Sequence, residues 1–133
     1  DLGGQPFRVV VADLSFISLR LVAARLVGST ARGGDLVLLV KPQFEAGRQE
    51  ASRGKGVIRD PQLWREAVEG AIAAMEAAGA TMMGIMVSPL RGADGNVEFL
   101  AHLGAGGGPG LPSLAITADL EAALARAGSD RGN

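Results

Sequence analysis

Residues 35–42 read Asp-Leu-Val-Leu-Leu-Val-Lys-Pro, a run of five apolar residues that ends on a charge and a proline. A short apolar run with turn signals on both sides is typical of a β-strand. Residues 7–12 (FRVVVA) and 82–87 (MMGIMV) have the same character. Because residues 7–12 are almost continuously apolar, we expect that strand to be covered on both faces. A fourth strand is predicted over residues 97–103.

Between these strands apolar residues recur every three to four positions, which is typical of amphipathic helices. The first helical stretch includes Leu19 to Val27, with Ser15 as a candidate N-cap and Gly28 as a stop signal. The second begins at Asp60-Pro61, a capping residue followed by a proline suited to a first helical turn. Its expected core face consists of Leu63, Trp64, Ala67, Val68, Ala71, Ile72 and Met75.

Strands that alternate with helices predict an α/β fold with a largely parallel sheet. The last two predicted strands differ, because only residues 88–96, which include Ser88-Pro89 and the turn residues 93–96, stand between them. A connection of this length is too short for a parallel crossover but can join antiparallel neighbours. We therefore predict that the last strand runs against the other three.

The chain of 133 residues has the size of one compact domain. We divide it into a domain over residues 1–103 and a tail over residues 104–133. The tail opens with a glycine-rich segment that we expect to be a flexible linker. A short amphipathic stretch follows, with Ile116, Leu120 and Leu124 at a spacing of four.

The composition excludes several classes of protein. A hydrophobic fraction of 47% is too high for a disordered chain, and the absence of cysteine excludes disulfides, thiolate nucleophiles and cysteine-based zinc sites. We predict no metal site. No apolar run approaches the ~20 residues of a membrane span, and no leader peptide opens the chain. The sequence favours a soluble domain of the cytoplasm, and its net charge of −1 does not by itself indicate nucleic-acid binding.

Three ionisable residues from distant parts of the chain are predicted to meet at one edge of the sheet. Asp13 follows the first strand, Lys41 follows the second, and Glu98 lies at the start of the reversed strand. In open α/β sheets ligands bind beyond the carboxyl ends of the parallel strands. Taken singly, Asp13 could be a helix cap, Lys41 a solvated strand-end charge and Glu98 a turn residue in water. Together they suit a site that moves protons.

The polar stretch over residues 43–59 is a second candidate site. It combines the aromatic Phe44 with the cations Arg48, Arg53 and Lys55, beside the expected edge of the sheet. Arginine and lysine bind phosphates and an aromatic ring stacks on an unpaired base, so these residues suit single-stranded RNA. The alternative is a solvated loop whose Phe44 packs into the core. The single histidine, His102, is expected to be a strand residue rather than a ligand or a base.

Four strings carry a resemblance to a known family. They are VVADLSFISLRLV, GGDLVLLVKPQFEAGR, GKGVIRDP and SPLRGADGNVEF, in this order along the chain. Together they resemble the TlyA (haemolysin-A-like) family of ribosomal RNA 2′-O-methyltransferases, which is related to the FtsJ-type methyltransferases. The resemblance extends over residues 7–103. It implies a Rossmann-like methyltransferase fold with an antiparallel last strand, S-adenosyl-L-methionine as cofactor, and ribosomal RNA or a ribosomal subunit as partner.

The same resemblance implies roles for individual residues. The family has a catalytic Lys-Asp-Lys-Glu tetrad, and Asp13, Lys41 and Glu98 match its last three members. Asp13, Leu14 and Ser15 match the segment beside the cofactor. The first lysine, the cofactor's glycine loop and an S4-type RNA-binding domain precede this region in the family, so we expect the chain to be part of a longer protein. Alone, it is expected to be inactive and to bind the cofactor weakly or not at all.

Two other functions are open at this point. The first is a non-catalytic α/β module that binds RNA or another ligand, in which the charged residues only fix loops. The second is the pore-forming activity that the haemolysin name suggests, although the sequence has no segment long enough to cross a bilayer. We also expect the exposed side of the first strand to favour a homodimer of the fragment.

Overall fold

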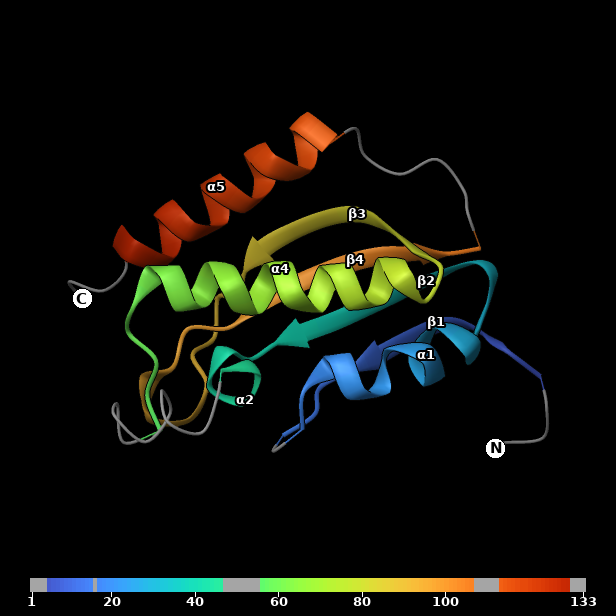
Figure 1. The fold of residues 1–133 in the computed structure, drawn as a ribbon, viewed down its shortest axis with the longest axis horizontal. Coiled ribbons are helices and arrows are strands. Elements are labelled where there is room, and N and C mark those ends of the chain that lie inside the picture. The colour runs from blue at the N-terminus through green and yellow to red at the C-terminus, as the bar shows by residue number, and fades with distance from the viewer. Residues whose placement is uncertain (1–4, 16, 47–55, 107–112, 130–133) are drawn as a thin grey trace.

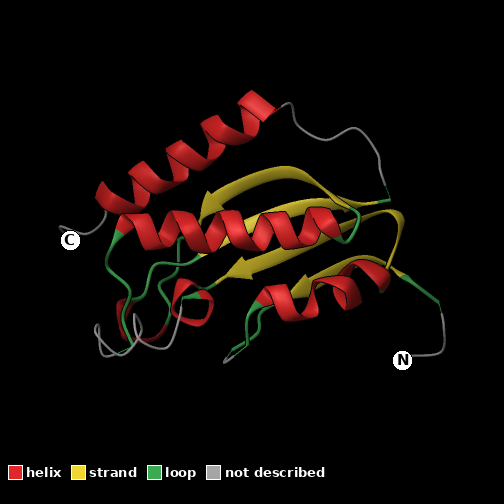
Figure 2. Ribbon diagram, viewed as in Figure 1, coloured by secondary structure: helices red, strands yellow, loops and turns green. Residues whose placement is uncertain are grey.

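The computed structural model describes residues 5–15, 17–46, 56–106 and 113–129. They form one four-stranded sheet with helices packed against it (Figures 1 and 2). The strands lie in the order β1-β2-β4-β3, with β1 parallel to β2, and with β4 antiparallel to both β2 and β3. The α/β fold and the reversed last strand are therefore confirmed. The strands are β1 (Phe7–Ala12), β2 (Thr30–Val40), β3 (Ala80–Val87) and β4 (Phe99–Ala105).

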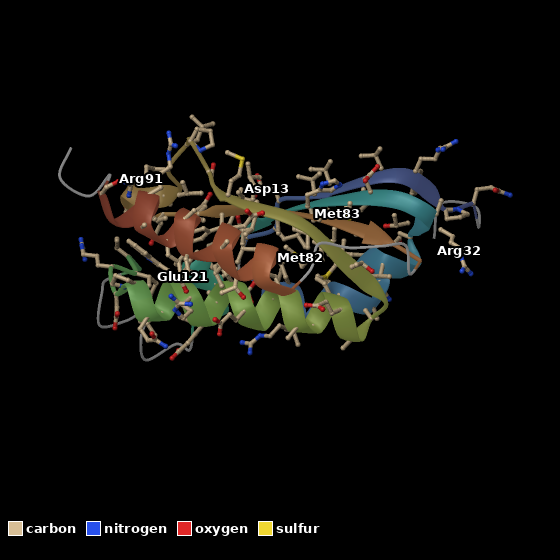
Figure 3. All side chains as sticks on the ribbon, turned by 90° about the horizontal axis from the view of Figure 1, so that it is seen from above. Asp13, Arg32, Met82, Met83, Arg91 and Glu121 are labelled. Carbon is tan, nitrogen blue, oxygen red and sulfur yellow. The ribbon has the colours of Figure 1, made fainter. Side chains whose placement is uncertain are left out.

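The helices cover the sheet unevenly. Seen from above, α1 and α4 lie on one side of it (Figure 3), and α5 packs along the edge strand β3. A short helix, α2, follows β2 directly, and a 3-10 turn, η1, precedes β4. The helical bounds are α1 (Leu19–Gly28), α2 (Pro42–Glu45), α4 (Pro61–Ala77), α5 (Ser113–Ser129) and η1 (Ala93–Gly95).

The core lies between the sheet and α4. Along β2 every second residue from Leu36 to Val40 is fully buried, and the same alternation runs along β4. Trp64 of α4 meets Phe99 of β4 edge to face, with ring centroids 6.5 Å apart. Met75 of α4 is also fully buried. The expected core positions of Trp64 and Met75 are thus confirmed, and this packing fixes β2 and β4 side by side under one helix.

The expectation that β1 is covered on both faces is wrong for the part of the chain that the structure describes. Phe7, Val9 and Val11 are 45%, 60% and 71% exposed, while Ala12 on the opposite face is buried. The physical reason is the position of β1 at the edge of the sheet, with the described helices α1 and α4 on its other side. A continuous apolar run shows that the side chains on both faces of a strand are apolar. It does not show which face this chain covers.

Three boundaries also differ from those predicted. Ser18 rather than Ser15 caps α1, since its side chain accepts a hydrogen bond from the Arg20 N–H. β2 begins at Thr30 and contains Gly34, where a Cβ would lie 2.8 Å from the carbonyl oxygens of Ala31 and Arg8. Only glycine therefore allows this close backbone contact. β4 starts at Phe99, so Glu98 precedes the strand.

The C-terminal segment forms a long helix. α5 has 17 residues and buries Leu120, Ala123, Leu124 and Ala127. Leu120 and Leu124 thus lie on the packed face of a helix longer than the short amphipathic stretch expected there, while the Ile116 side chain lies outside the described residues. β4 continues to Ala105, and the rest of the predicted glycine-rich linker is outside the described residues. The division of the chain at residue 103 stays a prediction.

Candidate active site

Asp13 and Lys41 form an ion pair at the carboxyl edge of the sheet. The Lys41 ammonium also donates a hydrogen bond of 3.3 Å to the Ser15 hydroxyl oxygen. The Lys41 side chain is only 12% exposed, whereas the Asp13 side chain is 62% exposed. The structure therefore places a largely buried amine between two acceptors that both follow β1.

The topology explains this meeting. β1 and β2 are parallel, with Ala12 opposite Leu38, so both strands end at the same edge of the sheet. Asp13 is the first residue after β1, and Lys41 is the first after β2. A parallel pair delivers the residues after both strands to one edge, as the sequence predicted.

Glu98 reaches the same edge from the opposite direction. Val40 pairs with Phe99 in the antiparallel β2–β4 ladder, so the next residues outward are Lys41 and Glu98. On the other side, the Ser88 N–H donates a hydrogen bond of 2.8 Å to the Glu98 carbonyl oxygen. Asp13, Lys41, Glu98 and Ser88 thus follow one another along the edge in the order of their strands. We call Asp13, Lys41 and Glu98 the charged rim.

The Glu98 carboxylate is buried and contacts a residue that the sequence did not single out. Its side chain accepts a hydrogen bond of 2.8 Å from the Gln43 side-chain amide, and Glu98 and Gln43 are 6% and 8% exposed. Among the described residues, none donates a hydrogen bond to the buried amide oxygen of Gln43. A buried polar atom without a partner is rare in folded proteins, and a role in catalysis or in binding a water or ion is one explanation for it. Gln43 therefore positions Glu98 and leaves one acceptor free beside it.

Gly92 leaves room for the same carboxylate. A Cβ at this position would lie 2.1 Å from Oε2 of Glu98, closer than any real contact. Any other residue would force Glu98 to move. The turn around Gly92 is closed by its N–H, which donates a hydrogen bond of 2.8 Å to the Asn96 carbonyl oxygen. The carboxylate is thus held by an amide on one side and by backbone contact on the other.

The Asn96 side chain fastens the segment that leads into α4. It is 2% exposed, accepts a hydrogen bond of 2.9 Å from the Ile58 N–H, and donates one of 2.8 Å to the Gly56 carbonyl oxygen. Gln43, at the other end of the same connection, is bound to Glu98. The short segment from Gly92 to Glu98 therefore holds both ends of the connection between α2 and α4.

Glu45 connects the rim to helix α1. This side chain is buried and accepts hydrogen bonds of 2.8 Å from the Leu19 N–H and 2.5 Å from the Ser18 hydroxyl. The Arg20 guanidinium donates a further bond of 3.2 Å to the Glu45 carbonyl oxygen. α2 thereby holds the start of α1, and with it the segment after β1 that carries Asp13 and Ser15.

The second predicted site is described only in part. Phe44 is half-buried on α2, close in sequence to Lys41. Arg48, Arg53 and Lys55 lie outside the described residues, so their predicted role in binding RNA stays a prediction. His102 pairs with Asp35 at 2.8 Å on the sheet face away from α4, remote from the charged rim in the β2–β4 register.

Within the described ranges, no group of three or more histidine, aspartate or glutamate side chains is arranged to hold a metal ion. Among the described helices, none combines the length and the apolar character needed to cross a membrane.

Known proteins are similar to this chain in sequence and in fold. Residues 1–105 match the family model of the FtsJ-like methyltransferases. The chain is 46% identical over 102 residues to the 16S/23S rRNA (cytidine-2'-O)-methyltransferase TlyA of Mycobacterium tuberculosis, a match that covers 77% of this chain and 37% of that protein. It is 39% identical over 94 residues to Hemolysin A of Brachyspira hyodysenteriae, covering 71% of this chain and 39% of that protein.

A solved structure agrees with these matches. A Lactococcus lactis protein, whose crystal structure was described under the hemolysin name, superposes with a TM-score of 0.82 at 34% identity, over 94% of this chain and 57% of that chain. The chain spans less than two fifths of the two curated relatives. The resemblance seen in the sequence is confirmed, and the chain belongs to the FtsJ-like methyltransferase family.

Proposed function

We propose that the charged rim serves an S-adenosyl-L-methionine-dependent methyltransferase that acts on the ribose 2′-hydroxyl of ribosomal RNA. The observation that carries this proposal is the position of Lys41. It is a largely buried amine held by Asp13 and Ser15 at the ligand-binding edge of a methyltransferase-family sheet. Transfer to a hydroxyl group needs a residue that orients the oxygen and receives its proton, and Lys41 is the candidate.

The residues after β1 suit the amino-acid end of the cofactor. Asp13 is paired with Lys41 on one carboxylate oxygen but remains 62% exposed, so it can accept a further hydrogen bond from an ammonium group. Leu14 is half-buried and offers an apolar wall, and Ser15 offers a hydroxyl. S-adenosyl-L-methionine, when bound, supplies a methyl group on a positively charged sulfur. We assign Asp13, Leu14 and Ser15 to hold it.

The three residues of the charged rim have different proposed roles in the transfer step. A lysine side chain is ordinarily protonated at neutral pH, and it must release that proton before it can act as a base. A positive charge near Lys41, such as that on the sulfur of the bound cofactor, would favour the neutral amine. The neutral amine can accept the proton of the hydroxyl group. Asp13 fixes the direction of the Lys41 side chain. Glu98, oriented by Gln43, fixes the edge of the site on which the ribose rests.

RNA is the proposed partner, and the relatives support this choice. The M. tuberculosis relative is named for methylation of 16S and 23S rRNA. Half-buried Phe44 beside Lys41 provides an aromatic ring at the site, and Arg48, Arg53 and Lys55 are the proposed phosphate contacts. A ribosomal substrate places the protein in the cytoplasm. The second candidate function, a non-catalytic binding module, predicts RNA binding without methyl transfer.

The test is transfer of a radioactive methyl group from S-adenosyl-L-methionine to ribosomal RNA by the intact protein. We expect label in RNA that resists alkaline cleavage at the modified site, because a 2′-O-methyl group removes the attacking hydroxyl. Label on a base, or no label from a folded protein that binds both RNA and cofactor, would contradict the proposal.

A further inference from the structure

A cavity of about 530 Å³ lies between the end of β3 and helix α5. Its size falls in the range of small-ligand sites. The side chains that the argument uses are Met86, Ser88, Pro89, Asp119, Ala122 and Arg126. The three before residue 90 come from β3 and the turn that follows it, and the other three come from α5. None of them belongs to the charged rim.

The cavity adjoins the charged rim on the side away from the proposed cofactor residues. Ser88 lines the cavity, and its N–H is bound to the Glu98 carbonyl oxygen at 2.8 Å. The strand order places β1 and β2, with Asp13 and Lys41, on one side of Glu98, and β3 on the other. A substrate whose reacting group lies at the charged rim would extend over β3 into this cavity, since the cofactor occupies the β1 side.

The chemistry of the lining is amphipathic. Asp119 and Arg126 carry opposite charges on the same helix, and neither side chain forms an ion pair or a side-chain hydrogen bond within the described residues. Apolar Met86, Pro89 and Ala122 lie around them. The Asp119 carboxylate is half-buried and the Arg126 guanidinium is exposed, so both groups are accessible to a ligand in the cavity. The cavity therefore suits a ligand with an anionic group, a hydrogen-bond donor and a flat apolar body.

We propose that this cavity binds the nucleotide next to the methylated one. Arg126 contacts its phosphate, Asp119 accepts a hydrogen bond from an amino or imino group of its base, and the base lies against Met86 and Pro89. Arginine suits phosphate because its guanidinium presents several donors in one plane. The proposal rests on the proposed function, because a neighbouring nucleotide is present only if the methylated group belongs to an RNA chain.

Methionine methyl groups provide a direct test by NMR. In the intact protein labelled with 13C-methyl methionine, Met86 lies in the cavity, and Met83, also exposed and on the same strand, does not line it. We expect CMP and AMP to shift the Met86 signal in a saturable way and to leave Met83 unchanged. Cytidine and inorganic phosphate should each bind at least tenfold more weakly than CMP. No shift of Met86, or equal shifts of Met86 and Met83, would overturn the proposal.

Two pairs of variants sharpen the test. Arg126→Glu should weaken CMP binding at least tenfold, whereas Arg25→Glu, which also reverses a charge in the last turn of a helix, should not. Ala122→Trp should fill the cavity and abolish the Met86 shift, whereas Ala125→Trp at an exposed site outside the cavity should retain it. Equal effects within either pair would contradict the assignment.

The same variants separate this inference from the proposed function. If the wild-type protein methylates RNA and Arg126→Glu leaves the KM for RNA unchanged, the cavity is not a nucleotide site, and the proposed function stands. If CMP binds as predicted but the protein transfers no methyl group, the cavity stands as a nucleotide site, its place next to a methylated nucleotide is lost, and the proposed function fails. With both correct, Arg126→Glu raises the KM for RNA at least tenfold and changes kcat little.

Discussion

Gln43 donates a hydrogen bond of 2.8 Å to Glu98, and both side chains are buried although 55 residues separate them in the sequence. The pair joins α2, directly after β2, to the residue that precedes β4. It therefore fixes the direction of one carboxylate in the charged rim. A residue that acts through Glu98 in this way affects catalysis without contacting the substrate.

We predict that Gln43→Leu lowers kcat at least tenfold and changes the KM for RNA little, because Glu98 loses its direction while the surface that binds RNA remains. The variant should also lose about 1–3 kcal/mol of the free energy of unfolding, since a buried acceptor is left without its donor. Steady-state kinetics and urea unfolding measure the two effects. Gln62→Leu, at an exposed position of α4, is the matched control, and an equal loss of kcat there would rule out the positioning role.

Gln43→Glu tests the same contact by charge. It places a second carboxyl group beside buried Glu98, and two such groups are accommodated best when they share a proton. The free energy of unfolding of this variant, relative to wild type, should therefore fall as the pH rises from 4 to 8. Urea unfolding across this range checks the sign, and a difference that does not depend on pH would contradict it.

Lys41→Ala should reduce methyl transfer by the intact protein at least a hundredfold, because no other amine contacts Asp13 among the described residues. Arg32→Ala is the control, since Arg32 is exposed near the start of β2, far along the sheet from Asp13 (Figure 3). Circular dichroism establishes that both variants fold. Turnover of Lys41→Ala near the wild-type rate would remove Lys41 from the mechanism.

Gly92→Ala should destabilise the protein by about 1–3 kcal/mol, the usual cost of overpacking, and should displace the Glu98 carboxylate. The backbone of Gly92 has a φ of −80°, which alanine adopts freely, so the effect arises from contact with Glu98 alone. Gly28→Ala, where a Cβ would meet nothing within 4 Å, is the control and should not lose stability. Thermal unfolding of the two variants gives the comparison.

The Arg65–Glu121 ion pair, with atoms 2.6 Å apart, joins α4 to α5 and predicts a pH dependence. The hydrogen bond from Arg65 lowers the pKa of Glu121 below its usual 4.5, so the pair stabilises the fold above that value and is lost as the pH falls through the lowered pKa. Because both groups lie near the surface, the effect is small. Glu121→Gln should therefore differ from wild type in urea unfolding at pH 7, and the two should converge as the pH falls through the lowered pKa of Glu121. Glu76→Gln, at an exposed site, should show no such convergence.

Much of the fold and the meeting of all three members of the charged rim at one edge could be predicted from the sequence. The short connection before the last strand required an antiparallel partner, and the parallel pair required that Asp13 and Lys41 leave the sheet at one edge. These inferences depend on strand direction, which local sequence patterns determine. The roles of Gln43, Gly92 and Asn96 could not be predicted in this way, because each depends on a contact with a segment distant in the sequence or on the exact direction of a side chain. A glycine in a turn and an amide after Lys-Pro carry no local signal of a buried carboxylate.

The two attachments of the α2–α4 connection, at Gln43 and at Asn96, have a consequence for how this protein family can diversify. Once both ends of a loop are fixed, a change in its length adds little to the entropy of closing it, about 0.6 kcal/mol for each doubling. Under the proposed function, insertions or deletions between Ala46 and Gly56 would change the RNA shapes that bind beside the charged rim and leave the contacts of Gln43 and Glu45 in place. Target choice could then evolve separately from the transfer reaction.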